Sequence, residues 1–161
     1  MKMKLGKAIA AAVLLTPLSF AGMADPAAAA AVHIVTADVF VSAKDGFDGN
    51  SIKRKENITL THNKRTTSVT YRACTDGATA VLKLHVTLNG DETVTVRPNL
   101  ALYDASVWCE MKDLAGSKSP EPATLGGGRG RLILDFTVTS DKFLGKDEAF
   151  AGMTVTHNLW P

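Results

Sequence analysis

The two cysteines are the residues whose chemistry the sequence constrains most. Cys74 and Cys109 form the one possible intramolecular pair, and exported chains usually oxidise such a pair. There is no Cys-x-x-Cys motif and no histidine at ligand spacing from either cysteine, so a metal thiolate or a reactive thiol is disfavoured. The sequence therefore predicts a disulfide between them, worth about 3 to 4 kcal/mol in the chain-entropy account.

The four histidines show no spacing typical of metal ligands. His33 and His157 have the parity of the apolar residues around them, whereas His85 has the parity of polar neighbours. Structural zinc ligands usually come in pairs that are close in sequence within one element. No two of these histidines are that close in the sequence. We therefore expect no metal site and no cofactor.

One short segment carries several side-chain oxygens. Asp45, Asp48 and Asn50 alternate with glycines in a turn-forming cluster. Calcium binds such oxygens, but the distal glutamate of a hand-shaped calcium loop is missing. We expect a tight turn stabilised by Asp and Asn, with a calcium-dependent carbohydrate-binding module as an alternative function.

No catalytic constellation can be recognised. The chain has no Gly-x-Ser-x-Gly motif, and both thiols are expected to be oxidised. Acidic residues such as Asp104, Glu110 and Asp135 cannot be paired as acid and base from sequence, because any β-protein has surface acids. We therefore predict no catalytic residue and no enzymatic activity.

The two tryptophans are isolated from one another. Trp108 precedes Cys109, so we expect it to pack against the disulfide, and Trp160 should cover one end of the core. Two separate tryptophans do not form the aromatic row of a carbohydrate platform. If Trp160 is exposed instead, it would suit the anchoring of a protein partner.

The excess of basic over acidic residues comes from the start of the chain. The sequence has 18 basic and 16 acidic residues, and Lys2, Lys4 and Lys7 lie in a segment without acids. Without that segment the chain is close to neutral, which argues against nucleic acid as a partner. Two further basic runs, 53–55 and 64–65, suit a solvated strand at a sheet edge.

The first residues have the pattern of a secretory signal. Residues 1–24 combine a basic start, an apolar run too short to span a bilayer, and small residues before the cleavage point. An Ala-rich lead-in, 25–31, would follow, and 32–161 would form one domain. We therefore expect a secreted protein without membrane insertion.

Apolar residues recur at every second position after residue 32, which is the period of half-buried strands. The clearest case is 80–88, followed by an Asn-Gly turn that predicts a hairpin with 93–97. We expect the other strands at 33–43, 57–61, 68–74, 100–104, 131–139 and near the end, at 153–159.

These elements predict an all-β fold. About eight short antiparallel strands must bury one face of each sheet against another, which gives a β-sandwich with one disulfide. A small closed β-barrel is the alternative. We expect one helical turn at 108–114 and a long flexible loop at 115–130, because that segment is rich in Gly, Ser and Pro.

Residues 80–161 also resemble a group of small exported proteins. The stretch 100–116 contains Leu-Tyr, then Cys, then Asp-Leu-x-Gly, and Thr154–Asn158 lies in a late strand. This pattern is similar to secreted β-proteins of actinobacteria, mostly of unassigned function. The resemblance implies a secreted module without catalysis, and some such proteins are adaptor subunits of larger toxin assemblies.

We therefore expect a binding or adaptor module for another extracellular protein. The lead into the first strand would add as a strand to the partner. A secreted inhibitor of an extracellular hydrolase is an alternative, although inhibitors from these organisms usually have more disulfides in a shorter chain. The candidate contact residues are Val32, His33, Ile34, Val35 and Trp160.

Overall fold

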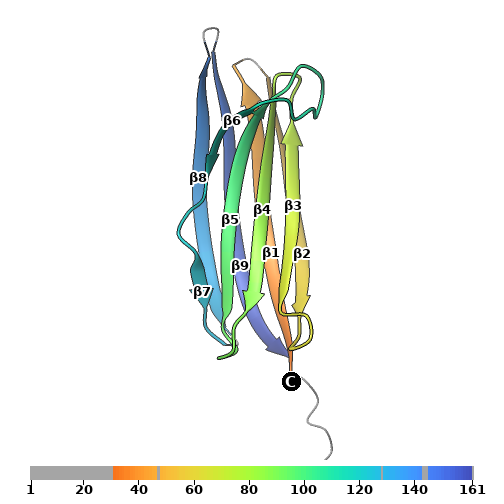
Figure 1. The fold of residues 1–161 in the computed structure, drawn as a ribbon, viewed down its shortest axis with the longest axis vertical. Coiled ribbons are helices and arrows are strands. Elements are labelled where there is room, and N and C mark those ends of the chain that lie inside the picture. Colours follow the sequence, from red (N-terminus) through yellow and green to blue (C-terminus); the bar gives the residue numbers. More distant parts are fainter. Residues whose placement is uncertain (1–30, 47, 128, 143–144, 161) are drawn as a thin grey trace, which may run out of the picture.

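The protein is a sandwich of two antiparallel sheets (Figure 1). The computed structural model describes residues 31–160 apart from 47, 128 and 143–144. For 141–145 it describes no side chains. The predicted signal peptide, 1–24, and the lead-in up to residue 30 lie outside the described residues. No helix capable of crossing a membrane occurs in the part that is described.

Nine strands occur in the described chain. The first sheet has the order β2-β1-β9-β8, and the second has the order β3-β4-β5-β6 with β7 also paired to β5. The sheets do not close into a barrel, so the sandwich prediction is confirmed and the barrel alternative is wrong. The strands are β1 (Val32–Asp45), β2 (Asp48–Leu60), β3 (Thr66–Cys74), β4 (Ala78–Leu88), β5 (Val94–Asp104), β6 (Leu114–Lys118), β7 (Ala123–Leu125), β8 (Gly130–Lys142) and β9 (Gly145–Trp160).

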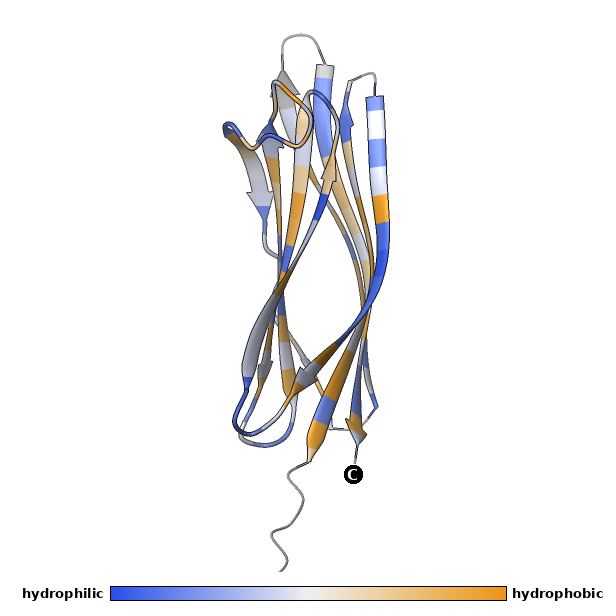
Figure 2. Cartoon of the chain, turned by 90° about the vertical axis from the view of Figure 1, so that its right-hand side faces the viewer, coloured by the Kyte–Doolittle hydropathy of each residue, from blue (hydrophilic) through white to orange (hydrophobic). Residues whose placement is uncertain are grey.

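Alternating side chains build the core between the sheets. Figure 2 shows hydrophobic and hydrophilic positions following one another along the strands. On β4 the side chains of Leu82, Leu84 and Val86 are fully buried, and on β1 those of Val35 and Val39 meet the same core. The predicted period of two therefore identifies the inward face correctly.

Strand β5 runs through Pro98, where the sequence suggested a break between two strands. Pro98 pairs with Leu84 of β4. On the other side of β5, β7 pairs with residues 94–96 and β6 with residues 100–103, which leaves a gap beside Pro98. A proline has no N–H to donate to a neighbouring strand. It is tolerated here because no strand pairs with β5 in this gap.

The segment after β5 differs from the prediction. Residues 108–114 form no helical turn. The stretch expected as one flexible loop, 115–130, contains most of β6 and all of β7. Short strands with Ser and Gly lack the apolar alternation that reveals a strand in sequence.

The basic run at 53–55 is confirmed as part of an edge strand. β2 is at one edge of the first sheet, and these three side chains are exposed. Charged side chains on an edge oppose pairing with the strand of another molecule.

Candidate functional site

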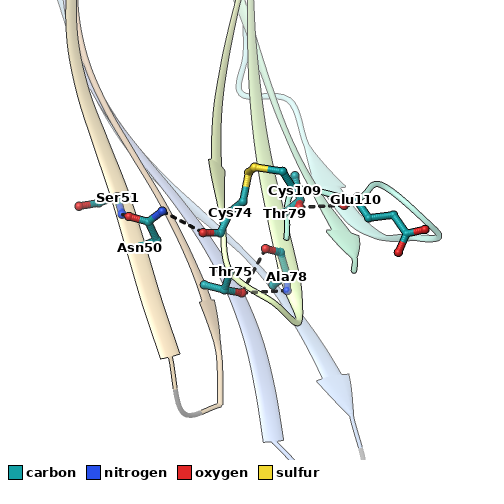
Figure 3. The surroundings of a disulfide bond; sticks show 8 residues. All are labelled: Asn50, Ser51, Cys74, Thr75, Ala78, Thr79, Cys109 and Glu110. Carbon is teal, nitrogen blue, oxygen red and sulfur yellow. Dashed lines mark hydrogen bonds between the residues drawn. A yellow bond between two sulfur atoms is a disulfide. The ribbon is translucent and has the colours of Figure 1, made fainter. Parts of the chain in front are cut away.

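The Cys74–Cys109 disulfide (Figure 3) lies where β3 ends, at the end of the sandwich opposite the end of β9 (Figure 1). Cys74 is the last residue of β3, and Cys109 lies in the connection from β5 to β6, with the two Cα atoms 5.0 Å apart. The Asn50 side-chain amide donates to the Cys74 carbonyl oxygen at 2.9 Å. The predicted disulfide is therefore confirmed, and such a bond is typical of an oxidising environment.

The connection at 105–113, here named the Trp108 loop, is fastened to the neighbouring strands. Thr79 on β4 donates its hydroxyl to the Glu110 carbonyl oxygen at 2.8 Å (Figure 3). The Ala105 amide donates to the Gly77 carbonyl at 3.0 Å, and the Lys112 amide to the Asp104 carbonyl at 2.9 Å. Together with the disulfide, these bonds fix both halves of the loop.

Within the Trp108 loop, Glu110 caps the backbone. Both the amide and the hydroxyl of Ser106 donate to one Glu110 carboxylate oxygen. These two hydrogen bonds lower the pKa of Glu110, since they favour its charged form. Cys109 has a φ of 61°, a left-handed conformation that is uncommon for a residue with a Cβ and recurs at functional sites.

The Trp108 loop and the first residue of β6 present large apolar side chains to solvent. The exposed fractions are 61% for Val107, 60% for Trp108, 44% for Met111 and 59% for Leu114. Trp108, which was expected to pack against the disulfide, therefore has most of its side chain in solvent. The disulfide fixes the backbone beside Trp108, and the Trp108 side chain remains exposed.

The candidate contact residues at the start of β1 do not form a free edge. β1 pairs with β2 on one side and with β9 on the other, so β1 itself offers no free edge for the addition of a partner strand, while the Ala-rich lead-in up to residue 30 lies outside the described residues. His33 and Val35 are fully buried, and Val32 and Ile34 are half-buried. Trp160 is 66% exposed instead of covering the core, which is the condition stated for a partner anchor.

Asp45 and Asn50 act within the turn region of β1 and β2. One Asp45 carboxylate oxygen accepts from the Asp48 amide at 3.0 Å, and the other accepts from the Gly77 amide at 2.9 Å. The side-chain oxygen Oδ1 of Asn50 accepts from the Ser51 amide at 2.8 Å. These contacts agree with the interpretation as a tight turn.

At the opposite end of the sandwich, two buried histidines form a pair. His33 Nδ1 and His157 Nε2 are 3.0 Å apart, and His157 Nδ1 is 3.0 Å from the Gly126 carbonyl oxygen. Burial lowers the pKa of His33, the charge of His157 lowers it further, and Glu92 partly opposes this shift. His33 is therefore neutral near pH 7.

Two exposed residues join this pair from separate turns. His62 lies in the β2–β3 turn, with its ring centroid 6.3 Å from that of His33. Glu92 lies in the β4–β5 turn, and its Oε1 is 3.9 Å from His62 Nε2. Each of His33, His62 and Glu92 offers one ligand atom, and these atoms lie within 4.8 Å of one another.

This cluster was missed by sequence analysis, which considered only ligands close together in one element. The core parity of His33 and His157 was correctly identified. No local signal connects His62 or Glu92 to them, because their two turns reach the start of β1 only when the two sheets pack. His85, by contrast, hydrogen-bonds Ser68 on the neighbouring strand at 2.7 Å.

Comparisons of the chain with protein-family models and with curated proteins found no match.

Proposed function

We propose that this protein is a secreted, non-catalytic binding module that engages another extracellular protein through the Trp108 loop. One observation carries the proposal: a loop anchored by a disulfide exposes Val107, Trp108 and Met111, with Leu114 directly after it. Exposed apolar side chains gathered in this way mark surfaces that become buried on association.

The chemistry of the loop suits a protein interface. Tryptophan is enriched among the residues that dominate binding energy, and such residues are usually surrounded by a polar rim. Lys112 and Asp113 are exposed within the same loop and supply charged groups around the apolar side chains. A partner with an apolar pocket bordered by polar groups would fit this arrangement.

The anchoring of the loop supports the same function. Ordering a flexible segment on binding costs free energy, and a loop that is already fixed avoids most of that cost. The disulfide and the hydrogen bonds from Thr79 and Ala105 hold the Trp108 loop before any partner arrives. Secretion is supported by the signal-like pattern of residues 1–24 and by the disulfide.

The test is affinity capture from the culture medium of the producing organism, with co-eluting proteins identified by mass spectrometry. We expect the wild type to retain a reproducible partner and Trp108→Ala to lose it. Ile133→Ala is the matched control, because Ile133 is 59% exposed but lies on the outer face of β8. Equal capture by Trp108→Ala and Ile133→Ala, or no partner at all, would contradict the proposal.

The variant Trp160→Ala distinguishes between the two ends of the sandwich as the site of partner binding. If Trp160→Ala abolishes capture and Trp108→Ala does not, the partner docks at the chain terminus and the Trp108 loop is not the site. A subunit of a toxin-like assembly would co-elute with the other subunits of that assembly.

An inhibitor of an extracellular hydrolase is the second candidate, favoured by the same rigid exposed loop. Inhibition in a panel of secreted proteases should then be stoichiometric and should disappear with Trp108→Ala.

A further inference from the structure

The Nε2 atom of His33 is a buried nitrogen without a hydrogen-bond partner among the described residues. Buried polar atoms are nearly always paired, so each exception calls for an explanation such as an ion. The atom belongs to a fully buried ring at the end of the sandwich where β1 begins. The groups around it show what it would bind.

With both rings neutral, the hydrogen bonds assign which nitrogen of His33 carries the proton. The Gly126 carbonyl oxygen can only accept, so His157 Nδ1 must donate to it. In the neutral ring, His157 Nε2 then accepts from His33 Nδ1. His33 Nε2 is left with a lone pair and no hydrogen, which is the state in which an imidazole binds a metal ion.

Histidines that bind metal ions generally have a hydrogen-bond partner on the ring nitrogen that does not bind the ion. Such a histidine donates its other ring N–H to an acceptor, which fixes the orientation of the ring and increases the basicity of the ligating nitrogen. Here the acceptor is His157, which is itself oriented by Gly126. His33 is therefore positioned like a ligand before any ion binds.

We propose that His33, His62 and Glu92 bind a divalent transition-metal ion, zinc in the first instance. Two imidazoles and one carboxylate form a donor set suited to zinc, with a remaining position for water. The proposal is independent of partner binding, because this cluster and the Trp108 loop lie at opposite ends of the sandwich.

The distances allow the site to close. Ligand atoms around tetrahedral zinc lie about 3.3 Å apart, given bonds of roughly 2.0 to 2.1 Å, and here they lie within 4.8 Å. The side chains of His62 and Glu92 are each 48% exposed and lie on turns, so rotation of these two can bring them to the fixed His33.

The backbone of Glu92 has an unusual conformation within the β4–β5 turn. Its φ is 61°, a left-handed conformation that is uncommon for a residue with a side chain. Such conformations persist where the surrounding structure imposes them and are concentrated at functional sites. In this conformation the carboxylate of Glu92 lies 3.9 Å from His62. It also lies within 4.8 Å of a ring nitrogen of His33, which belongs to the other sheet.

The test is titration of the folded protein with zinc chloride, followed by calorimetry and by thermal unfolding. We expect one ion per chain and a melting temperature that rises with zinc concentration, because an ion bound only by the native state stabilises it. Calcium should leave the melting temperature unchanged, since calcium prefers ligand sets made of oxygen. No zinc response at millimolar concentration, or an equal calcium response, would overturn the proposal.

His62→Ala and Glu92→Gln remove exposed ligands without opening the core, and each should weaken zinc binding roughly 10-fold or more. His85→Ala is the matched control, because it removes a histidine outside the cluster. Binding that is equally strong in His62→Ala and in His85→Ala would show that zinc is not held at this site.

Nuclear magnetic resonance provides a readout without substitutions. The ¹⁵N shifts of His33 in the metal-free protein should show a protonated Nδ1, and zinc should shift the Nε2 resonance. A protonated Nε2 in the metal-free protein would contradict the proton arrangement on which the site depends.

Discussion

At the scale of single residues, Tyr71 and Glu56 link the two sheets. Tyr71 lies on β3 of the second sheet and is 4% exposed, and its hydroxyl donates to Glu56 Oε2 on β2 of the first sheet at 3.2 Å. Burial raises the pKa of Tyr71, and the negative charge of Glu56 raises it further. The neutral phenol is thus the form that the folded protein favours.

Tyr71→Phe removes the hydroxyl and keeps the ring. We expect the free energy of unfolding to fall by about 1 kcal/mol at pH 8, the usual contribution of one such hydrogen bond. Above pH 10 the unfolded chain releases the Tyr71 proton while the folded chain retains it, so the wild type loses stability and the difference narrows. Urea unfolding of both proteins at pH 8 and above pH 10 measures this, and a constant difference would contradict it.

At the scale of elements, β6 connects the two layers through a close approach at Gly116. A Cβ atom added to Gly116 would lie 2.9 Å from Val138 Cγ1 on β8. Val138 is buried in the core, at 6% exposure, so it has little freedom to move. The absence of a side chain on Gly116 therefore lets β6 lie against the edge of the first sheet.

Gly116→Ala should destabilise the protein by about 1 to 3 kcal/mol, because it overpacks this contact. Gly126→Ala is the control, since a Cβ there meets no atom within 4 Å. Chemical unfolding of both variants measures the difference. Equal stabilities would show that β6 moves away from β8 without cost.

The alternation of Val, Leu and Thr was sufficient to predict the sandwich, the β4–β5 hairpin and the inward faces of the long strands. It was insufficient for β6 and β7, because they lie in a segment whose Ser, Gly and Pro residues suggest a loop. The position of β1 inside its sheet depends on long-range pairing with β9, which parity does not reveal. The exposure of Trp108 depends on the path of one loop, and the histidine cluster depends on how two turns meet the start of β1.

At the scale of the whole molecule, the disulfide and the histidine cluster lie at opposite ends of one sandwich. The disulfide joins β3 to the Trp108 loop, and the proposed zinc site joins the start of β1 to the β2–β3 and β4–β5 turns. Effects at distant sites without shared contacts usually add. The two ends can therefore be tested separately.

Replacing both Cys74 and Cys109 by Ser should lower the free energy of unfolding by about 3 kcal/mol, since the loop that the bond closes becomes free in the unfolded chain. The Trp108 loop should lose its fixed conformation and partner capture should weaken. Chemical unfolding measures the first effect and affinity capture the second, and thermal unfolding with and without zinc tests whether the far end is affected. If the zinc-dependent rise in melting temperature also disappeared, the two ends would not be independent.

The pairing of Val32 with Trp160 places the entry and the exit of the sandwich side by side. β1 has 14 residues, so the far end of the sandwich lies roughly 45 Å away. A label or carrier protein fused after Trp160 would leave the disulfide end free for contact and would sit beside His33 and His157. A polyhistidine tag at that position would compete for zinc, so purification for metal analysis should use a tag without histidine.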